Sequence, residues 1–197
     1  MNKVFTTKNI AGMAVFSAVS FVIYLLEIPI FASTPASFLQ LDFSNVLVML
    51  GGFMYGPIPA LIVCLVKEAL HLTVTTTGGV GELANFIITT CYVLLPSIVY
   101  KKRKGFKTVV LVLIIACVIQ SLVSLLVNKF INFPFFMGGA PFVPNEISEQ
   151  AFLELWGYVL AFNAIKSVAV SIVTIVLYKR ISYLFKKINL QNSSKDV

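Results

Sequence analysis

Apolar residues fill six long stretches of this chain, separated by short segments rich in charged or turn-forming residues. The stretches run over residues 9–26, 43–55, 58–72, 82–100, 108–130 and 152–178. A helix needs about 20 residues to span a bilayer. The pattern predicts an all-α integral membrane protein with six transmembrane helices in a single domain, residues 1–197. The second and third stretches are short and meet at Tyr55-Gly56-Pro57, which favours a tight hairpin buried among its neighbours, because backbone groups left unsatisfied toward lipid are costly.

Basic residues indicate how these helices are oriented. Twelve of the 15 Lys and Arg residues fall before the first stretch, between the fourth and fifth, or after the sixth: Lys3, Lys8, Lys101, Lys102, Arg103, Lys104, Lys107, Lys179, Arg180, Lys186, Lys187 and Lys195. With six spans, these three places share one side of the membrane. Cytoplasmic loops carry an excess of Lys and Arg, so both termini are expected to be cytoplasmic.

The connections on the opposite side are longer and contain their own turn residues. Residues 28–40 include two prolines, residues 73–81 include Gly78-Gly79, and residues 132–148 include three prolines and two glycines. Long loops gathered on one face are often functional. We expect them to cover a cavity that opens to the outside.

Polar side chains within the predicted helices mark the candidate binding site, since ionisable and amide groups are expensive at bilayer depth. Asn163 and Lys166 share one helix face, Asn128 ends a polar face that begins at Gln120 and Ser124, and Glu82, Asn85 and Thr89 form a third. If the three faces converge, they line a pocket for a flat heterocycle with a hydrogen-bonding edge. Its expected apolar walls are Phe86, Phe130, Phe133, Phe135, Phe136, Phe152 and Trp156.

Each of these residues also has a purely structural interpretation. Asn and Ser side chains often hold membrane helices together, and Trp156 stands at the depth of an interfacial aromatic belt. Lys67 and Glu68, as neighbours on a helix, point about 100° apart, so Lys67 is a candidate partner for Asp42 instead. His71 has no second ligand at suitable spacing, which favours an interfacial residue over a metal ligand.

The first predicted helix has a face of small residues, Ala11, Ala14 and Ala18. Such faces permit close helix approach. The partner is either another helix of this chain or a separate membrane protein.

Composition agrees with a membrane location. The chain is 58% hydrophobic and only 12% charged, with a net charge of +7. In a soluble protein this charge would suggest nucleic acid, but here the basic residues flank the spans as topology signals. The sequence contains no phosphate-binding G-x-x-x-x-G-K-[ST] loop, and we expect neither a metal nor a cofactor.

An ordered set of short motifs resembles a known family. The motifs are Leu41-Asp42-Phe43-Ser44, Tyr55-Gly56-Pro57 followed by Val66-Lys67, Gly81-Glu82-Leu83-Ala84-Asn85-Phe86, and Phe162-Asn163-Ala164-Ile165-Lys166. Together they are similar to the substrate-binding S components of energy-coupling factor (ECF) vitamin transporters, most closely to the riboflavin-specific members. Two departures are Asn45, where an acid often follows Leu-Asp-Phe-Ser, and a long loop over residues 132–148.

The resemblance implies a binding subunit without its own energy source, which docks on one transmembrane coupling (T) protein and two ATPase subunits. It implies that riboflavin binds near the outer face, at Asn128, Asn163 and Lys166 and at the loop residues Leu41 and Asp42. It also implies that Ala14 and Ala18 face the coupling protein.

The resulting prediction is a cell-membrane subunit that captures riboflavin and is not an enzyme. Because riboflavin is uncharged, Lys166 is expected to act as a hydrogen-bond donor and not as a counter-ion. Three alternatives stay open: another vitamin or heterocycle as cargo, a scaffold without ligand, and a membrane-embedded enzyme using Glu82, His71 and Lys67, although no paired carboxylates or nucleophile motif support the last.

Overall fold

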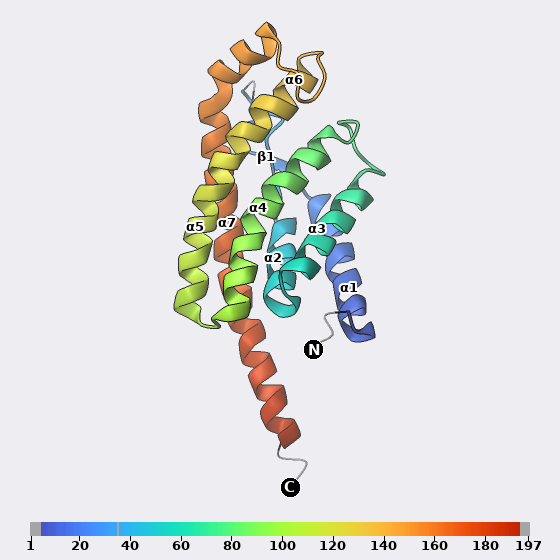
Figure 1. The fold of residues 1–197 in the computed structure, drawn as a ribbon, viewed down its shortest axis with the longest axis vertical. Coiled ribbons are helices and arrows are strands. Elements are labelled where there is room, and N and C mark those ends of the chain that lie inside the picture. The colour runs from blue at the N-terminus through green and yellow to red at the C-terminus, as the bar shows by residue number, and fades with distance from the viewer. Residues whose placement is uncertain (1–4, 35, 194–197) are drawn as a thin grey trace.

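A computed structural model of the chain shows a bundle of α-helices (Figure 1). The structure describes residues 5–34 and 36–193, without the side chains of residue 8 and of residues 181–193. Within these residues the helices of 12 residues or more are α1 (Thr7–Tyr24), α2 (Ser44–Tyr55), α3 (Pro57–His71), α4 (Val80–Lys102), α5 (Phe106–Val127) and α7 (Glu146–Ser193). Six helices therefore stand where the apolar pattern predicts them.

The short helices α2 and α3 form the predicted hairpin, and α2 occupies the centre of the bundle. Gly56 joins them with a φ of 104°, a conformation that side-chain-bearing residues rarely adopt. A Cβ atom on Gly52 would lie 2.0 Å from Ser97 Oγ, so this glycine lets α2 approach α4 closely. Nine of the 12 residues of α2 are buried, and the helix packs against α1, α3, α4 and α7.

The segment expected to be a loop at residues 132–148 is helical at both ends, which corrects the prediction in part. A π-helical turn (Asn128–Asn132) continues α5 into the short helix α6 (Phe133–Phe136), and α7 begins at Glu146, six residues before the predicted start. Pro134 is tolerated because the first turn of a helix does not need its missing N–H. The loop itself is confined to residues 137–145, which contain the other four turn residues, Gly138, Gly139, Pro141 and Pro144.

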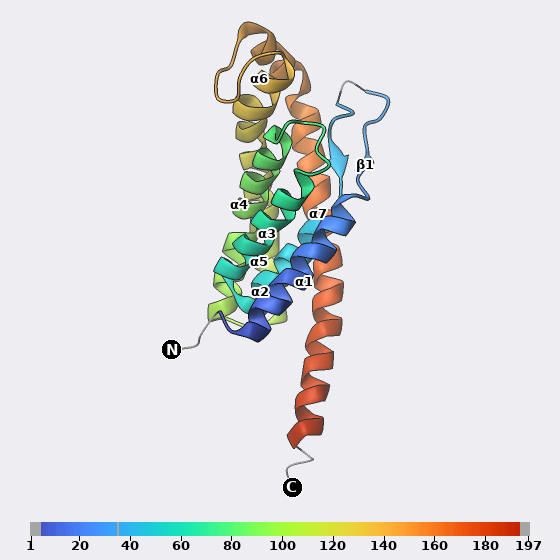
Figure 2. The ribbon, with the colours of Figure 1, turned by 90° about the vertical axis from the view of Figure 1, so that its right-hand side faces the viewer.

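The connection between α1 and α2 is a small β-hairpin. Strand β1 (Ile28–Pro29) pairs antiparallel with β2 (Gln40–Leu41), with Ile28 opposite Leu41. Figure 2 shows this hairpin at the same end of the bundle as α6, beside the upper part of α7. We call this end the α6 end.

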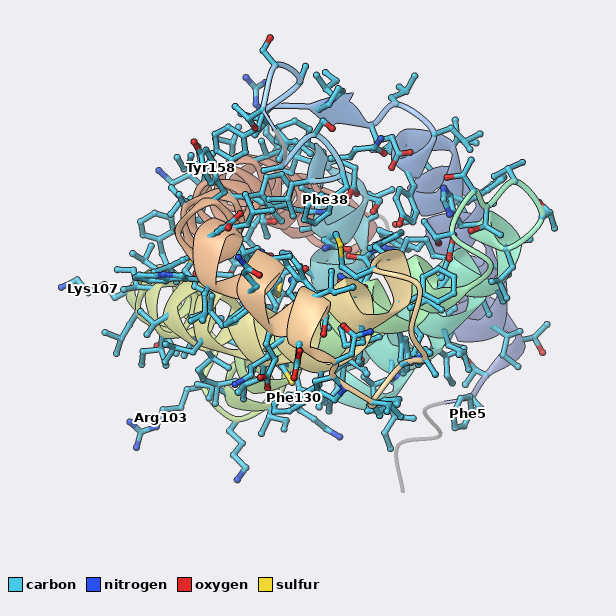
Figure 3. The ribbon with its side chains drawn as sticks, turned by 90° about the horizontal axis from the view of Figure 1, so that it is seen from above. Phe5, Phe38, Arg103, Lys107, Phe130 and Tyr158 are labelled. Atoms are coloured by element: carbon cyan, nitrogen blue, oxygen red, sulfur yellow. The ribbon has the colours of Figure 1, made fainter. Side chains whose placement is uncertain are left out.

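The opposite end carries the start of α1, the end of α7 and the basic connection between α4 and α5 (Figures 1 and 2). In the view along the bundle, Arg103 and Lys107 extend outward from it (Figure 3). The described basic residues of the α4–α5 connection therefore lie at the end of the bundle opposite α6, where they were expected to cluster. Lys3, Lys195 and the side chains of Lys8, Lys186 and Lys187 lie outside the described residues.

Three described helical segments are long and apolar enough to cross a membrane, namely Val80–Lys102, Phe106–Phe136 and Glu146–Arg180. The apolar helices α1 and α2 are shorter. At about 1.5 Å per residue, α2 extends only about 18 Å, less than the hydrocarbon thickness of about 30 Å. The structure therefore supports an all-α membrane protein, whereas six complete spans remain a prediction.

Candidate functional site: a polar cavity at the α6 end

A cavity of about 310 Å³ lies at the α6 end. It is bounded by the end of α1, the β-hairpin, the end of α3, the start of α4, η1 and α6, and the middle of α7. The described residues that line it are Tyr24, Glu27, Phe38, Leu39, Gln40, Asp42, His71, Thr76, Thr77, Gly81, Glu82, Ala84, Asn85, Ile88, Asn128, Asn132, Phe136, Phe162, Asn163 and Lys166.

Six of the seven predicted binding residues line this cavity: Asp42, Glu82, Asn85, Asn128, Asn163 and Lys166. They come from the segment between β2 and α2 and from α4, η1 and α7, so the three polar helix faces do converge. Leu41 is not among the lining residues; it lies in β2 and packs against an apolar cluster around Phe133 and Phe162. Gln120, Ser124 and Thr89 are buried deeper and also do not line the cavity.

Asp42 and Lys166 form a buried ion pair in the cavity wall, with 2.6 Å between Oδ2 and Nζ. The backbone N–H of Ser44 donates to Asp42 Oδ1 at 2.9 Å, and the Ser44 hydroxyl donates to the same oxygen. Burial raises the pKa of Asp42, but the neighbouring ammonium groups and the hydrogen bonds from Lys166 and Ser44 outweigh it and lower the pKa to about 2. Lys166 is therefore the counter-ion of Asp42 within the protein. An ammonium has three N–H groups, so its expected role as a hydrogen-bond donor to the ligand stays a prediction.

The asparagines of the cavity direct their amide N–H groups into the protein. Asn163 donates to the carbonyl of Val159 at 2.9 Å, and Asn128 donates to the carbonyl of Ser124 at 2.8 Å. Asn132, one turn further along the chain, donates to Asn128 Oδ1 at 3.0 Å. Asn132 was missed by the sequence analysis because it fell in the presumed loop, although its spacing from Asn128 already placed both on one helix face.

His71 and Glu82 join α3 to the start of α4. His71 Nδ1 lies 2.8 Å from Glu82 Oε1, and the imidazole stacks on the ring of Tyr24 with centroids 3.8 Å apart. Because a carboxylate only accepts hydrogen bonds, Nδ1 carries the proton. Thr77 donates to the other oxygen of Glu82 at 2.9 Å, which ties the α3–α4 loop to α4. His71 thus has partners within the protein, as the interfacial interpretation expected.

Glu27 and Gln40 add polar groups at the base of the β-hairpin. With its amide nitrogen facing Glu27, Gln40 lies 2.8 Å from Glu27 Oε2. Partial burial raises the pKa of Glu27 above its ordinary value. Neither residue stands in a polar helix face, so the periodicity used to find the other site residues could not identify them.

The apolar wall of the cavity differs from the prediction. Of the seven aromatic residues expected there, only Phe136 lines it. Phe86 packs into the core around α2, Phe133 and Phe152 pack on each other, and Trp156 is exposed. Phe38, Tyr24 and Phe162 supply the aromatic lining instead. Figure 3 shows Phe38 lying over the bundle and Phe130 at its edge. Which of the two rings reaches the cavity depends on how the segments pack against one another.

The hypothesis that Lys67 pairs with Asp42 is wrong. Lys67 Nζ lies 2.8 Å from Glu68 Oε1, despite the roughly 100° between neighbouring positions on a helix. Both side chains are long enough to bend toward the packed interior, where Lys67 is 0% and Glu68 4% exposed. Asp42 is reached from Lys67 only through Ser44.

The site is suited to holding a small, mainly uncharged molecule. Asp42 and Glu82 are already bonded to Lys166 and His71, and Glu27 accepts from the Gln40 amide. Within the residues that the structure describes, no group of three or more His, Cys, Asp or Glu side chains could hold a metal ion. Pockets of at least about 300 Å³ that combine apolar walls with few polar groups are typical of ligand sites.

The small-residue face of α1 lies on the outside of the bundle. Ala14 and Ala18 are exposed, whereas Met13, Ser17 and Ser20 of the same helix are buried. These alanines are therefore not used for helix packing within the described part of the chain, and a separate membrane protein is left as the predicted partner.

Two known transporters are similar in sequence to most of this chain. The chain is 32% identical over 181 residues to "Riboflavin transporter RibU" of Staphylococcus aureus (strain TCH60), covering 92% of this chain and 94% of that protein. It is 24% identical over 176 residues to "Riboflavin transporter FmnP" of Bacillus subtilis (strain 168), covering 87% and 90%.

The fold has a solved counterpart, described as the S component of a bacterial ECF transporter. The two structures superpose with a TM-score of 0.77 at 30% identity, covering 91% of this chain and 98% of that one. The sequence profile of the family "ECF transporter, substrate-specific component" matches residues 8–178. This chain belongs to the family of substrate-specific components of ECF transporters.

Proposed function

We propose that this chain is the riboflavin-binding S subunit of an ECF transporter and that riboflavin binds in the cavity at the α6 end. Family membership supports the transport role, and the names of the relatives support the cargo. The membrane-embedded enzyme alternative has no support from the family, whose members are transporter components. Riboflavin is here the transported ligand and not a cofactor.

The observation that carries the proposal is the convergence of six polar residues from four parts of the chain on one cavity. In this arrangement Asp42, Glu82, Asn85, Asn128, Asn163 and Lys166 bind the polar edge and ribityl chain of the ligand. Aromatic side chains, including Phe38 and Phe162, cover the ring system. We retain Leu41 as a candidate contact through its backbone only, because its side chain packs elsewhere.

The proposal includes a topology. The chain crosses the cell membrane six times, with the α6 end outside and both termini in the cytoplasm. The basic residues between α4 and α5 support this orientation. The exposed alanines of α1 are then available to a T protein, which works with two ATPase subunits; this chain itself has no phosphate-binding loop.

The test is to titrate the detergent-purified protein with riboflavin and follow quenching of flavin fluorescence. We expect saturable binding, and a Lys166→Ala variant that binds more weakly by about 1.5–3 kcal/mol, the range for a hydrogen bond to a charged group. Unlabelled vitamins serve as competitors. If another vitamin binds more tightly than riboflavin, that vitamin is the cargo. If none of the vitamins binds, the chain is a scaffold subunit without a ligand.

A further inference from the structure

A buried ion pair outside the cavity, Lys67 with Glu68, has no role in the function proposed above. Both residues are in α3, and neither belongs to the described residues that line the cavity. Charged side chains within membrane helices are costly and usually mark functional positions. Because Lys67 and Glu68 lie next to the cavity but do not line it, their role is not direct contact with the ligand.

The ammonium of Lys67 is fully occupied by the protein. Its Nζ lies 2.8 Å from Glu68 Oε1, 3.1 Å from Ser44 Oγ and 3.0 Å from Asn45 Oδ1. An ammonium has three N–H groups, so these three acceptors use all of them. The ring of Tyr24 covers the ammonium, with 4.8 Å from Nζ to its centroid. Lys67 therefore has no donor left for a ligand.

Two of these contacts lead directly to cavity residues. The Ser44 hydroxyl, which accepts from Lys67, donates to Asp42 Oδ1, and the other oxygen of Asp42 binds Lys166. On the other side of the pair, Glu68 Oε1 accepts a hydrogen bond from Asn85 Nδ2 at 2.8 Å. The pair thus joins α3 to a residue before α2 and to a residue of α4.

The bond to Glu68 also determines what Asn85 can offer a ligand. Because one N–H of the Asn85 amide donates to Glu68, the carboxamide is held in one orientation, and its carbonyl oxygen and second N–H remain for a ligand. A guest must therefore match this fixed arrangement, with a donor opposite the oxygen or an acceptor opposite the remaining N–H. If Glu68 were absent, the amide could rotate and present either atom.

We propose that Lys67 and Glu68 are a positioning pair for the ligand site: they hold Asp42 against Lys166 and orient the Asn85 carboxamide, and so determine which hydrogen-bonding groups the cavity selects. The inference rests on the proposed riboflavin site. It predicts that the pair controls selectivity between ligands and not merely the stability of the helix bundle. Asn45 takes part as an uncharged acceptor, which leaves Glu68 as the sole carboxylate directly contacting Lys67 within the described residues.

The test uses the double variant Lys67→Met/Glu68→Leu, which removes both charges together, leaves no unpaired ion in the interior and removes the acceptor of the Asn85 amide. Binding of riboflavin is compared with that of lumiflavin, which lacks the ribityl hydroxyls, and of 3-methylriboflavin, which lacks the ring N–H. We expect the preference of the wild-type protein for riboflavin over at least one analogue to fall about fivefold or more, as loss of one oriented hydrogen bond implies.

Matched controls separate positioning from stability. Tyr92→Phe removes a buried hydrogen bond between Tyr92 and Ser171 (2.6 Å) that joins α4 and α7 away from the cavity, so it is expected to lower thermal stability without changing the preference. If the double variant does not fold, Glu68→Asp keeps the charge but shortens the side chain, and the same loss of preference is expected.

Two outcomes for the double variant overturn the inference but not the proposed function. In one, the variant binds all three flavins more weakly by the same factor; in the other, it binds them as the wild-type protein does. A wild-type protein that binds riboflavin without preferring it over either analogue also overturns it. A wild-type protein that binds no riboflavin overturns the proposed function as well, which makes the two failures distinguishable.

Discussion

Asp42 and Lys166 are separated by 124 positions in the chain, yet their charged groups are 2.6 Å apart in a wall of the cavity. The pair connects the end of the β-hairpin to the middle of α7. Both residues are nearly inaccessible, with exposures of 1% and 6%. Breaking a buried pair is expensive because the remaining charge loses its partner in a medium of low polarity.

We therefore expect Lys166→Met to destabilise the ligand-free protein by about 3–5 kcal/mol, since it leaves Asp42 buried and uncompensated. The double variant Asp42→Asn/Lys166→Met removes both charges and is expected to recover most of this loss. Thermal unfolding in detergent without riboflavin measures both. A double variant no more stable than the single one would contradict this account of the pair.

Two of the carboxyl groups that line the cavity, those of Asp42 and Glu27, respond to pH in opposite directions. The lowered pKa of Asp42 means that its stabilising contribution is complete above its ordinary pKa of 3.8 and is lost only as the pH falls toward about 2. The raised pKa of Glu27 means that its contribution is complete below its ordinary pKa of 4.5 and is lost as the pH rises through the folded-state value.

Glu27→Gln tests this difference. Relative to the wild-type protein, the variant should become progressively more stable as the pH rises from about 4 to about 8, because it has no carboxylate to ionise. Melting temperatures of both proteins across this range provide the measurement. A difference between them that does not depend on pH would show that burial of Glu27 has no effect on its ionisation.

Thr77 is expected to slow ligand release by holding the α3–α4 loop against the cavity. Its hydroxyl donates to Glu82 at 2.9 Å and accepts from the backbone N–H of Gly81 at 3.1 Å. Thr77→Val keeps the shape and removes these bonds, so riboflavin should dissociate about five- to tenfold faster in stopped-flow fluorescence. Thr73→Val is the control, because the exposed Thr73 hydroxyl bonds only to the carbonyl of Leu70. Equal rates in the two variants would rule out this role for Thr77.

Ala14 and Ala18 are expected to contact the T protein. Replacing Ala14 with leucine should prevent close helix approach and weaken copurification with the T protein and the ATPase subunits, while riboflavin binding by the isolated subunit stays unchanged. Val19→Leu, also on the exposed side of α1 but on a different face, is the control. An Ala14→Leu variant that assembles normally would place the interface elsewhere on the chain.

Much of the fold could be predicted from the sequence. The six apolar stretches form helices because a helix satisfies its own backbone hydrogen bonds, and an apolar environment offers these groups no other partners. The turn at Gly56 is also local, since glycine tolerates its positive φ. By contrast, residues 132–148 contain several turn formers, and the prediction of a loop failed at both ends of this segment, where η1 and α6 continue α5 and pack against α7 and where α7 begins early.

The sequence by itself determined which polar residues lie on shared helix faces, because the spacing of Asn163 and Lys166 or of Glu82 and Asn85 depends only on helix geometry. Only the tertiary structure decided the partners of these groups. Lys166 binds Asp42, Lys67 binds Glu68, and Phe38 rather than Phe133 lines the cavity. These choices depend on how the helices and the β-hairpin pack, and contacts between distant segments are not encoded in local periodicity.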